Sequence, residues 1–284
     1  MTDTAREDLE AGTGSSTAVL RTVVGSVLRP IGGWMTASGA VELLDALDIP
    51  ASTARSSLTR LCARGVLRRE PRDGVAGYGL EPDAIPMLER GDARIFGDRS
   101  SGPEGWCLVS FSFPEHQRRQ RHQVRRRLAA LGCGTVADGL WIAPARLEDE
   151  LSAALAELGT GATGASLFTD ASVRGDLAAE VARWYDLPRI RAAHEAFLAA
   201  FGSVADPVDD RAAFALWMRA LDQWRVIPYR DPGLPAAALP ADWPAAASAR
   251  LFASLRASLA ARAVAYARQT AATDPASRAA AASR

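Results

Sequence analysis

Apolar positions recur with helical spacing in the segment 50–64 and leave the other side of that helix polar and basic. Ala54, Leu58 and Leu61 follow one another at intervals of four and three residues, which places them in one stripe that must be buried. Hydroxyl groups and arginines fall on the opposite side. Gly65 stands where a glycine commonly ends a helix, and a short apolar stretch follows it. The pattern predicts an amphipathic helix that stops at Gly65 and continues into a strand.

The segments on either side of this helix complete a small domain that we expect at 17–100. Thr36 or Ser38 is a suitable cap for the helix before it, and Asp73-Gly74 is typical of a tight β-hairpin turn. The elements predicted here are helices over 17–28, from 36 or 38 to about 47, and 50–64, and strands over 66–69 and 77–80. Three helices followed by a hairpin is the order of a winged helix-turn-helix domain.

A second unit, expected at 104–172, alternates strands and helices in a different order. The apolar stretch Trp106–Phe111 predicts a strand, and Asp138-Gly139 predicts a hairpin turn between the next two strands. The predicted elements are strands over 106–111 and 165–168, a hairpin over 135–142, and helices over 114–131 and 147–158. The order βαββαβ is that of a ferredoxin-like domain.

The rest of the chain is rich in alanine and helical in pattern, and we expect a helical C-terminal domain at 173–269. Its predicted helices cover 176–186, 188–201, 208–225 and 243–268. A proline-rich connection from Ile227 to Pro244 interrupts them. We expect residues 1–16 and 270–284 to be disordered tails. The predicted fold class is therefore α+β, with three structured domains.

The chain as a whole carries 33 basic and 33 acidic residues, but the arginines are concentrated in two places. Six of them stand between Pro50 and Arg72, where Glu70 is the one acid. Arginine pairs with guanine or phosphate, and small hydroxyls let a helix approach a polyanion closely. We therefore expect contacts to DNA from Ser52, Arg55, Ser56, Thr59, Arg60, Arg64 and Arg72. The alternative is a surface helix with a solvated face. Bracing of the helix is an alternative role for Arg55, which lies about 90° from the core stripe.

The second concentration is six arginines between Glu115 and Arg127. Arg121 falls near the apolar stripe of its helix, and an arginine that points inward needs an acid or a phosphate. One interpretation is a clamp for the phosphates of a ligand, formed by Arg118 and Arg121. The alternatives are an outer face that pairs with acids and an extension of the DNA footprint.

Aromatic residues and one arginine flank the proline-rich connection. Trp224, Arg225 and Tyr229 are candidates for a pocket that holds an aromatic group. The alternative is that these aromatics pack an interdomain core.

Neither composition nor spacing predicts a catalytic or metal site. The three cysteines have no CxxC or Cys–His spacing, and the three histidines have no partners spaced for zinc or a catalytic triad. The chain has no signal peptide and no run of about 18 apolar residues. We therefore expect a cytoplasmic protein without a membrane span.

Three blocks of residues occur in an order that is known from one protein family. They are Arg-Ser-Ser-Leu-Thr-Arg-Leu at 55–61, Gly-Leu-Trp-Ile at 139–142 and Trp-Arg-Val-Ile-Pro-Tyr-Arg-Asp-Pro-Gly-Leu-Pro at 224–235. In these blocks the chain resembles the PaaX family, the winged-helix repressors of phenylacetic-acid catabolism, and the resemblance extends over about residues 17–268. The wing tip at 72–77 departs from the family because it is less basic than expected.

The resemblance implies a homodimeric transcriptional repressor that binds a palindromic double-stranded DNA operator. It also implies release by an aryl-CoA thioester, so that phenylacetyl-CoA or another acyl-CoA is the small-molecule effector; we expect no cofactor. One alternative is a repressor or activator of an unrelated pathway with a different effector. A more remote alternative is a nuclease, because similar ferredoxin-like CRISPR-associated nucleases hold a metal through an acid after the first strand. Here the residues at 110–114 are Ser-Phe-Ser-Phe-Pro, so we expect a regulator and not an enzyme.

Overall fold

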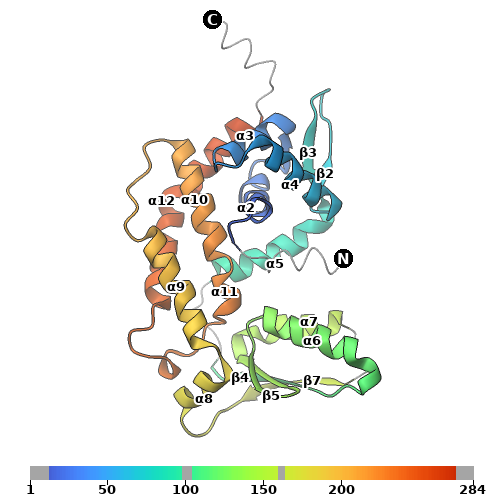
Figure 1. The fold of residues 1–284 in the computed structure, drawn as a ribbon, viewed down its shortest axis with the longest axis vertical. Helices are drawn as coiled ribbons and strands as arrows, with labels where there is room; N and C mark the ends of the chain where they lie inside the picture. Colours follow the sequence, from blue (N-terminus) through green and yellow to red (C-terminus); the bar gives the residue numbers. More distant parts are fainter. Residues whose placement is uncertain (1–12, 98–103, 159–163, 273–284) are drawn as a thin grey trace, which may run out of the picture. The chain divides into compact units, whose positions relative to one another are not determined.

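The computed structural model describes residues 13–97, 104–158 and 164–272 (Figure 1). The chain divides into two compact units, each built from separate stretches of sequence. Unit 1 comprises Met1–Ile95, Phe197–Val226 and Ala247–Arg284, and unit 2 comprises Phe96–Ala196 and Ile227–Ala246. Most of the two expected tails lies outside the described residues. Within the described part of the chain, no helix is both long enough and apolar enough to span a membrane.

Unit 1 starts with short helices and a small sheet, and two helices from late in the sequence complete it. Its elements are α2 (Ser16–Val23), the π-helical turn η1 (Val24–Leu28), β1 (Trp34–Thr36), α3 (Ala37–Asp45), α4 (Ala51–Ala63), β2 (Leu67–Arg69), β3 (Gly77–Leu80), η2 (Pro82–Ala84), α5 (Ile85–Phe96), α10 (Asp210–Trp224) and α12 (Ala245–Ala271). The three helices and the hairpin expected in the N-terminal part are present, and the first helix ends in the π-helical turn.

A side-chain cap explains where α3 begins. Thr36 Oγ1 accepts a hydrogen bond of 2.9 Å from the Gly39 backbone N–H, which would otherwise have no partner in the first turn. Of the two caps that the sequence suggested, Thr36 is the one that forms.

The small sheet of unit 1 has the antiparallel order β1-β3-β2. Asp73 and Gly74 at the tip of the β2–β3 hairpin have φ angles of 51° and 80°, the left-handed values that a tight mirror-image turn requires. The predicted turn is therefore confirmed. Strand β1 was not predicted, because three residues are too short to show an alternating pattern; the strand is defined by its pairing with β3, with Trp34 opposite Gly79.

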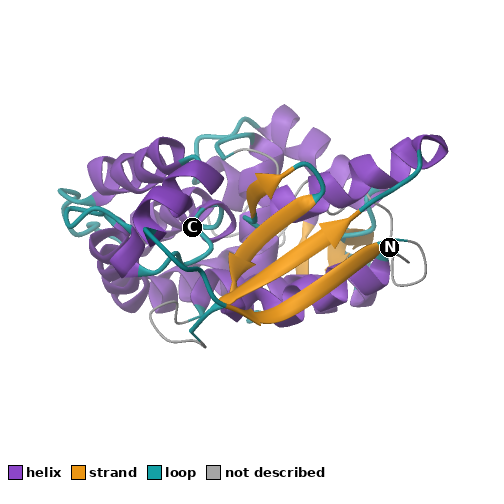
Figure 2. Cartoon of the chain, turned by 90° about the horizontal axis from the view of Figure 1, so that it is seen from below, coloured by secondary structure: helices purple, strands orange, loops and turns teal. Residues whose placement is uncertain are grey.

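Unit 2 contains a four-stranded antiparallel sheet with the order β5-β6-β4-β7 (Figure 2). Its elements are β4 (Trp106–Phe111), η3 (Glu115–Gln117), α6 (Arg118–Ala130), β5 (Gly134–Ala137), β6 (Leu140–Pro144), η4 (Ala145–Leu147), α7 (Glu148–Glu157), β7 (Ala165–Ala171), α8 (Leu177–Trp184), most of α9 (Leu187–Phe201), α11 (Ile227–Arg230) and η6 (Ala236–Ala238). The sequence order of its strands and of α6 and α7 is the predicted ferredoxin-like order.

Both faces of this sheet are covered by apolar side chains. Cys107, Val109 and Phe111 of β4 contribute to one core with residues of α6 and α7. Trp106 and the partly buried Leu108 belong to a second core, which includes residues of α8 and of the segment after α11. Successive side chains of a strand point to opposite faces, so burial on both sides accounts for the uninterrupted apolar run of β4.

The residues expected as one C-terminal domain at 173–269 are divided between the two units. Helix α8, most of α9 and the segment 227–246 belong to unit 2, whereas α10 and nearly all of α12 belong to unit 1. The physical reason is that the helices bury their apolar sides against different partners. Those partners lie far away in the sequence, and local spacing does not reveal them.

Two buried polar contacts fix the C-terminal residues in unit 2. The Tyr185 hydroxyl donates a hydrogen bond of 3.0 Å to the Ile142 carbonyl of β6, and burial raises the pKa of that hydroxyl well above its usual value. The ring lies so close to Gly134 that a Cβ there would be 2.7 Å from it. His194 Nε2 and Asp231 Oδ2 lie 2.9 Å apart and are both buried, which joins α9 to the segment after α11.

Candidate functional site

Helix α4 has the predicted buried stripe and the predicted exposed face. Ala54 and Leu58 are 0% exposed and Leu61 is 1% exposed. Five of the expected DNA contacts are exposed on the other side, and Arg64, at the end of the helix, is half-buried. The exposed five are Ser52, Arg55, Ser56, Thr59 and Arg60. The 3.6-residue period alone is enough to sort these positions.

The hydroxyl groups on this face bond to the helix itself. Ser56 Oγ donates to the Ser52 carbonyl and Thr59 Oγ1 donates to the Arg55 carbonyl, both over 3.0 Å. Each hydroxyl keeps its oxygen as an acceptor. The face therefore offers short acceptors beside long cationic donors.

The two arginines in the middle of the face differ in their surroundings. Arg60 is held by α2 and by its own helix, since its Nε donates to Thr17 Oγ1 and its Nη2 to Ser57 Oγ, both over 3.0 Å. Arg55 has no hydrogen-bond or ion-pair partner among the residues that the structure describes. The sequence leaves bracing of the helix open as a role for Arg55, but in the structure Arg60 makes the bracing contacts.

Arg72 is part of the internal structure of the hairpin. Its Nε lies 2.9 Å from Glu70 Oε1, and its guanidinium lies over the Trp34 ring at 5.2 Å from the centroid. The hydrogen bond from Arg72 lowers the pKa of the Glu70 carboxyl. Trp34 in turn donates to the Glu70 carbonyl over 2.8 Å. These contacts stabilise the tip of the β2–β3 hairpin and engage one edge of the Arg72 guanidinium.

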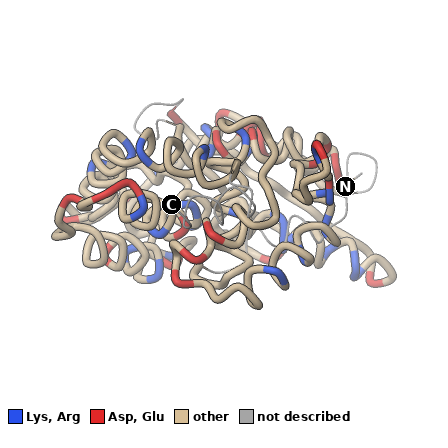
Figure 3. Tube along the Cα trace, turned by 90° about the horizontal axis from the view of Figure 1, so that it is seen from above, with Lys and Arg blue, Asp and Glu red and all other residues tan. Residues whose placement is uncertain are grey.

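The arginines of α6 lie largely on an exposed surface with acids against several of them. Arg118 is exposed, whereas Arg121 is half-buried and its Nη2 donates to Glu115 over 3.1 Å. Arg125 pairs with Asp138 over 3.0 Å. Figure 3 shows basic and acidic positions interspersed along the described part of the chain. Each exposed pair contributes about 0–1 kcal/mol to stability, so these contacts leave the cluster available for other partners.

Trp224 lies in the core of unit 1. It is 3% exposed, stacks on Phe252 with ring centroids 4.5 Å apart, and donates through Nε1 to the Ile95 carbonyl over 3.1 Å. Arg225 is also buried in unit 1, whereas Tyr229, Arg118 and Arg121 belong to unit 2. The five residues proposed for ligand binding are thus divided between the two units.

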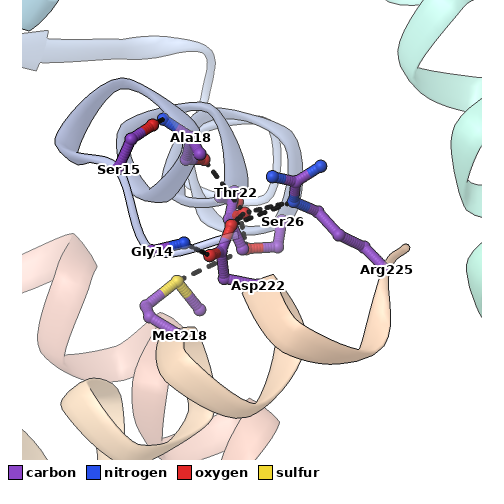
Figure 4. A network of polar contacts seen from close by, with 8 residues as sticks. All are labelled: Gly14, Ser15, Ala18, Thr22, Ser26, Met218, Asp222 and Arg225. Atoms are coloured by element: carbon purple, nitrogen blue, oxygen red, sulfur yellow. Dashed lines mark hydrogen bonds and ion pairs between the residues drawn. The ribbon is translucent and has the colours of Figure 1, made fainter. Parts of the chain in front are cut away.

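The structure also shows a buried polar cluster that sequence reasoning missed (Figure 4). Asp222 of α10 accepts hydrogen bonds from the Gly14 N–H over 2.8 Å, from Thr22 Oγ1 over 3.0 Å and from Arg225 Nε over 3.0 Å. Arg21, next to Thr22 on α2, is 4% exposed. The one sequence signal was an arginine among the apolar positions of the segment 17–28.

Ion pairs attach α10 to the end of α3 and to the turn between α3 and α4. Arg211 pairs with Asp45 over 2.9 Å, and Arg219 forms an ion pair with Asp48. Asp48 has a φ of 61°, so it occupies the left-handed region within this turn. Helix α10 therefore contacts the N-terminal helices both through the buried cluster and at the surface.

Within the described part of the chain, no group of three or more His, Cys, Asp or Glu side chains is arranged to hold a metal ion. The residues directly after β4, the position expected to carry an acid in a nuclease, include Ser112 and Phe113.

Comparison with known proteins places all three parts of this architecture in one class, that of proteins with a PaaX-type N-terminal region, a central Cas2-like domain and a PaaX-type C-terminal domain. The matching family descriptions are "PaaX-like protein" at 15–83, "PaaX protein central Cas2-like domain" at 101–182 and "PaaX-like protein C-terminal domain" at 185–269. The chain belongs to the PaaX family.

One curated relative and one solved structure extend this comparison. The chain is 23% identical over 239 residues to the "Transcriptional repressor PaaX" of Escherichia coli (strain K12), which covers 81% of this chain and 75% of that protein. It also matches the structure of the "Uncharacterized protein Rv0674 from Mycobacterium tuberculosis" with a TM-score of 0.55 and 23% identity. That match covers 86% of this chain and 97% of the other, and supports the fold alone.

Proposed function

We propose that the protein is a DNA-binding transcriptional repressor in which α4 is the recognition helix of a winged helix-turn-helix and the β2–β3 hairpin is the wing. The observation that carries this proposal is the exposed face of α4, which combines arginines with hydroxyl acceptors and contains no acid. Such a face suits the major groove, where arginine donates to guanine and hydroxyls bond to base edges or phosphates. The name of the Escherichia coli relative supports the repressor role.

We further propose that the protein acts in the cytoplasm as a homodimer on a palindromic operator and regulates an aromatic-acid catabolic operon of the phenylacetate type. Two recognition helices then need a separation of about 34 Å, one turn of duplex. In one arrangement of the dimer the two recognition helices have a spacing that does not fit the operator. An aryl-CoA thioester such as phenylacetyl-CoA would release the repressor by binding this arrangement more tightly than it binds the DNA-bound form. The family resemblance supports this effector class, and Arg118 and Arg121 are the proposed contacts to its phosphates.

A titration of the protein on the DNA upstream of its own gene, with and without phenylacetyl-CoA, tests both proposals. We expect sequence-selective binding that weakens as salt rises, because arginine contacts to phosphate release counterions, and we expect the thioester to weaken it further. Measurement by fluorescence anisotropy, with a scrambled duplex as the control, separates the outcomes. Equal affinity for both duplexes would reject the operator, whereas selective binding that ignores the thioester would reject the effector class.

A further inference from the structure

The buried cluster of unit 1 contains a guanidinium group with an unused hydrogen-bonding edge. Arg21 is 4% exposed, and its Nε and Nη2 have no hydrogen-bond partner in the part of the chain that the structure describes. The pKa of Arg21 is lowered to about 9, first by burial and then by the nearby Arg225, whereas Asp222 opposes both effects. A buried charge without a partner is costly, because the solvation that it loses is not replaced.

Asp222, the acid that acts on Arg21 electrostatically, is already engaged. The two carboxylate oxygens of Asp222 accept from the Gly14 N–H, from Thr22 and from Arg225, as Figure 4 shows. This carboxylate is oriented toward Arg225, and neither Nε nor Nη2 of Arg21 bonds to it. The charge of the Arg21 side chain is therefore not compensated through that edge.

We propose that Arg21 is the principal contact of a binding site for a small oxyanion, a carboxylate or a phosphate group, at the junction of α2 and α10. The Nε and Nη2 atoms form one edge of the planar guanidinium, and two parallel N–H donors on such an edge match two oxygens of one carboxylate or phosphate. Arg225 contributes positive potential to the same place. This assignment depends neither on operator binding nor on the identity of the effector.

The position of the site gives the anion a structural effect. Helix α2 holds Arg60 of α4 through Thr17, and α10 holds the end of α3 and the turn before α4 through its surface ion pairs. An anion at Arg21 would neutralise the charge of this buried side chain and would stabilise the packing of α2 against α10. Unit 1 is therefore expected to be more stable with the anion bound, by the amount that mass action gives.

Thermal unfolding in phosphate, phenylacetate or chloride at equal ionic strength tests the site. We expect phosphate, phenylacetate or both to raise the unfolding midpoint of the wild-type protein above its value in chloride. A higher midpoint in phosphate alone would identify the ligand group as a phosphate, and a higher midpoint in phenylacetate alone would identify it as a carboxylate. Arg21→Met removes the charge and keeps a side chain of similar length; this variant should unfold in chloride at or above the wild-type temperature and should show no anion response.

Two further variants keep the experiment decisive. Arg250→Met changes an exposed arginine of α12 in the same unit and should keep the full anion response. Arg21→Lys keeps the charge but offers a single point donor, so about tenfold more anion should be needed for the same midpoint shift. The proposal fails if the wild-type midpoint is the same in all three salts, or if Arg21→Met responds to the anions as the wild type does. If Arg21→Met does not fold, a wild-type response of Arg21→Lys overturns the proposal.

Discussion

Alanine at Arg55 should weaken binding to the operator by about tenfold or more, while the protein keeps its stability. Arg55 is exposed and has no partner in the described part of the chain, so its removal breaks no internal contact. A bidentate contact from arginine to guanine contributes about 1–3 kcal/mol to discrimination between bases, which is the source of the expected loss. Arg60→Ala should also weaken binding, but it removes the contacts to Thr17 and Ser57 and should therefore lower the unfolding temperature as well.

Anisotropy titrations and thermal unfolding of both variants separate these two roles. Arg250→Ala, which removes an exposed arginine from α12, is the matched control and should bind as the wild type does. If Arg55 reads a base, its loss relaxes specificity at one operator position; if it contacts a phosphate, all sequences weaken together and the salt dependence falls by about one unit of slope. Unchanged affinity of Arg55→Ala across a salt titration would exclude this part of α4 from the interface.

Local features of the molecule could be predicted from the sequence because local periodicity controls them. The exposed face of α4 follows from a period of 3.6 residues, and the hairpin turn follows from the left-handed preference of Asp73-Gly74. The order of elements in the central sheet follows from alternating apolar runs and turn signals in the same way. The DNA contacts themselves stay a prediction, because exposure of a side chain does not show what it binds.

Features that depend on distant partners could not be predicted. Gly14 and Asp222, which share a hydrogen bond, are separated by 208 positions, and Thr17 and Arg60 by 43. The spacing of residues around these four positions does not predict such contacts. For the same reason the sequence does not reveal the division of the C-terminal helices between two units: α8 and α10 each have an apolar side, but they pack on different partners.

The division bears on the proposed release of the protein from DNA by an effector. Helix α10 packs in the unit that carries α4, and the segment that directly follows it, from Ile227, belongs to unit 2. A ligand that changes the environment of 227–246 therefore acts on residues that are covalently continuous with the helix that holds α2 and the turn before α4. Linkage of this kind requires that the ligand bind two arrangements of the chain with different affinity.

Replacement of Gly39 by valine should lower the stability of the protein by about 1–3 kcal/mol, because α3 and the end of α12 are in direct backbone contact. A Cβ at Gly39 would lie 2.5 Å from the Thr270 carbonyl oxygen and 2.8 Å from the Ala271 Cα. Backbone atoms cannot rotate away as a side chain does, so either α12 or α3 must shift. The expected fall in the midpoint of thermal unfolding is about 2–10 °C.

Gly91→Ala is the matched control for this substitution. Gly91 lies inside α5, and a Cβ there would meet no atom within 4 Å. Alanine has the higher helix propensity and reduces the freedom of the unfolded chain, so this variant should gain about 0.4–1 kcal/mol. Opposite shifts of the two variants would show that the close contacts around Gly39, which include Thr36 Oγ1 at 2.9 Å as well as α12, and not the loss of a glycine, destabilise Gly39→Val. A wild-type midpoint for Gly39→Val would mean that the end of α12 does not rest on α3. In that case α12 would not hold α3, the helix that precedes α4, through this contact.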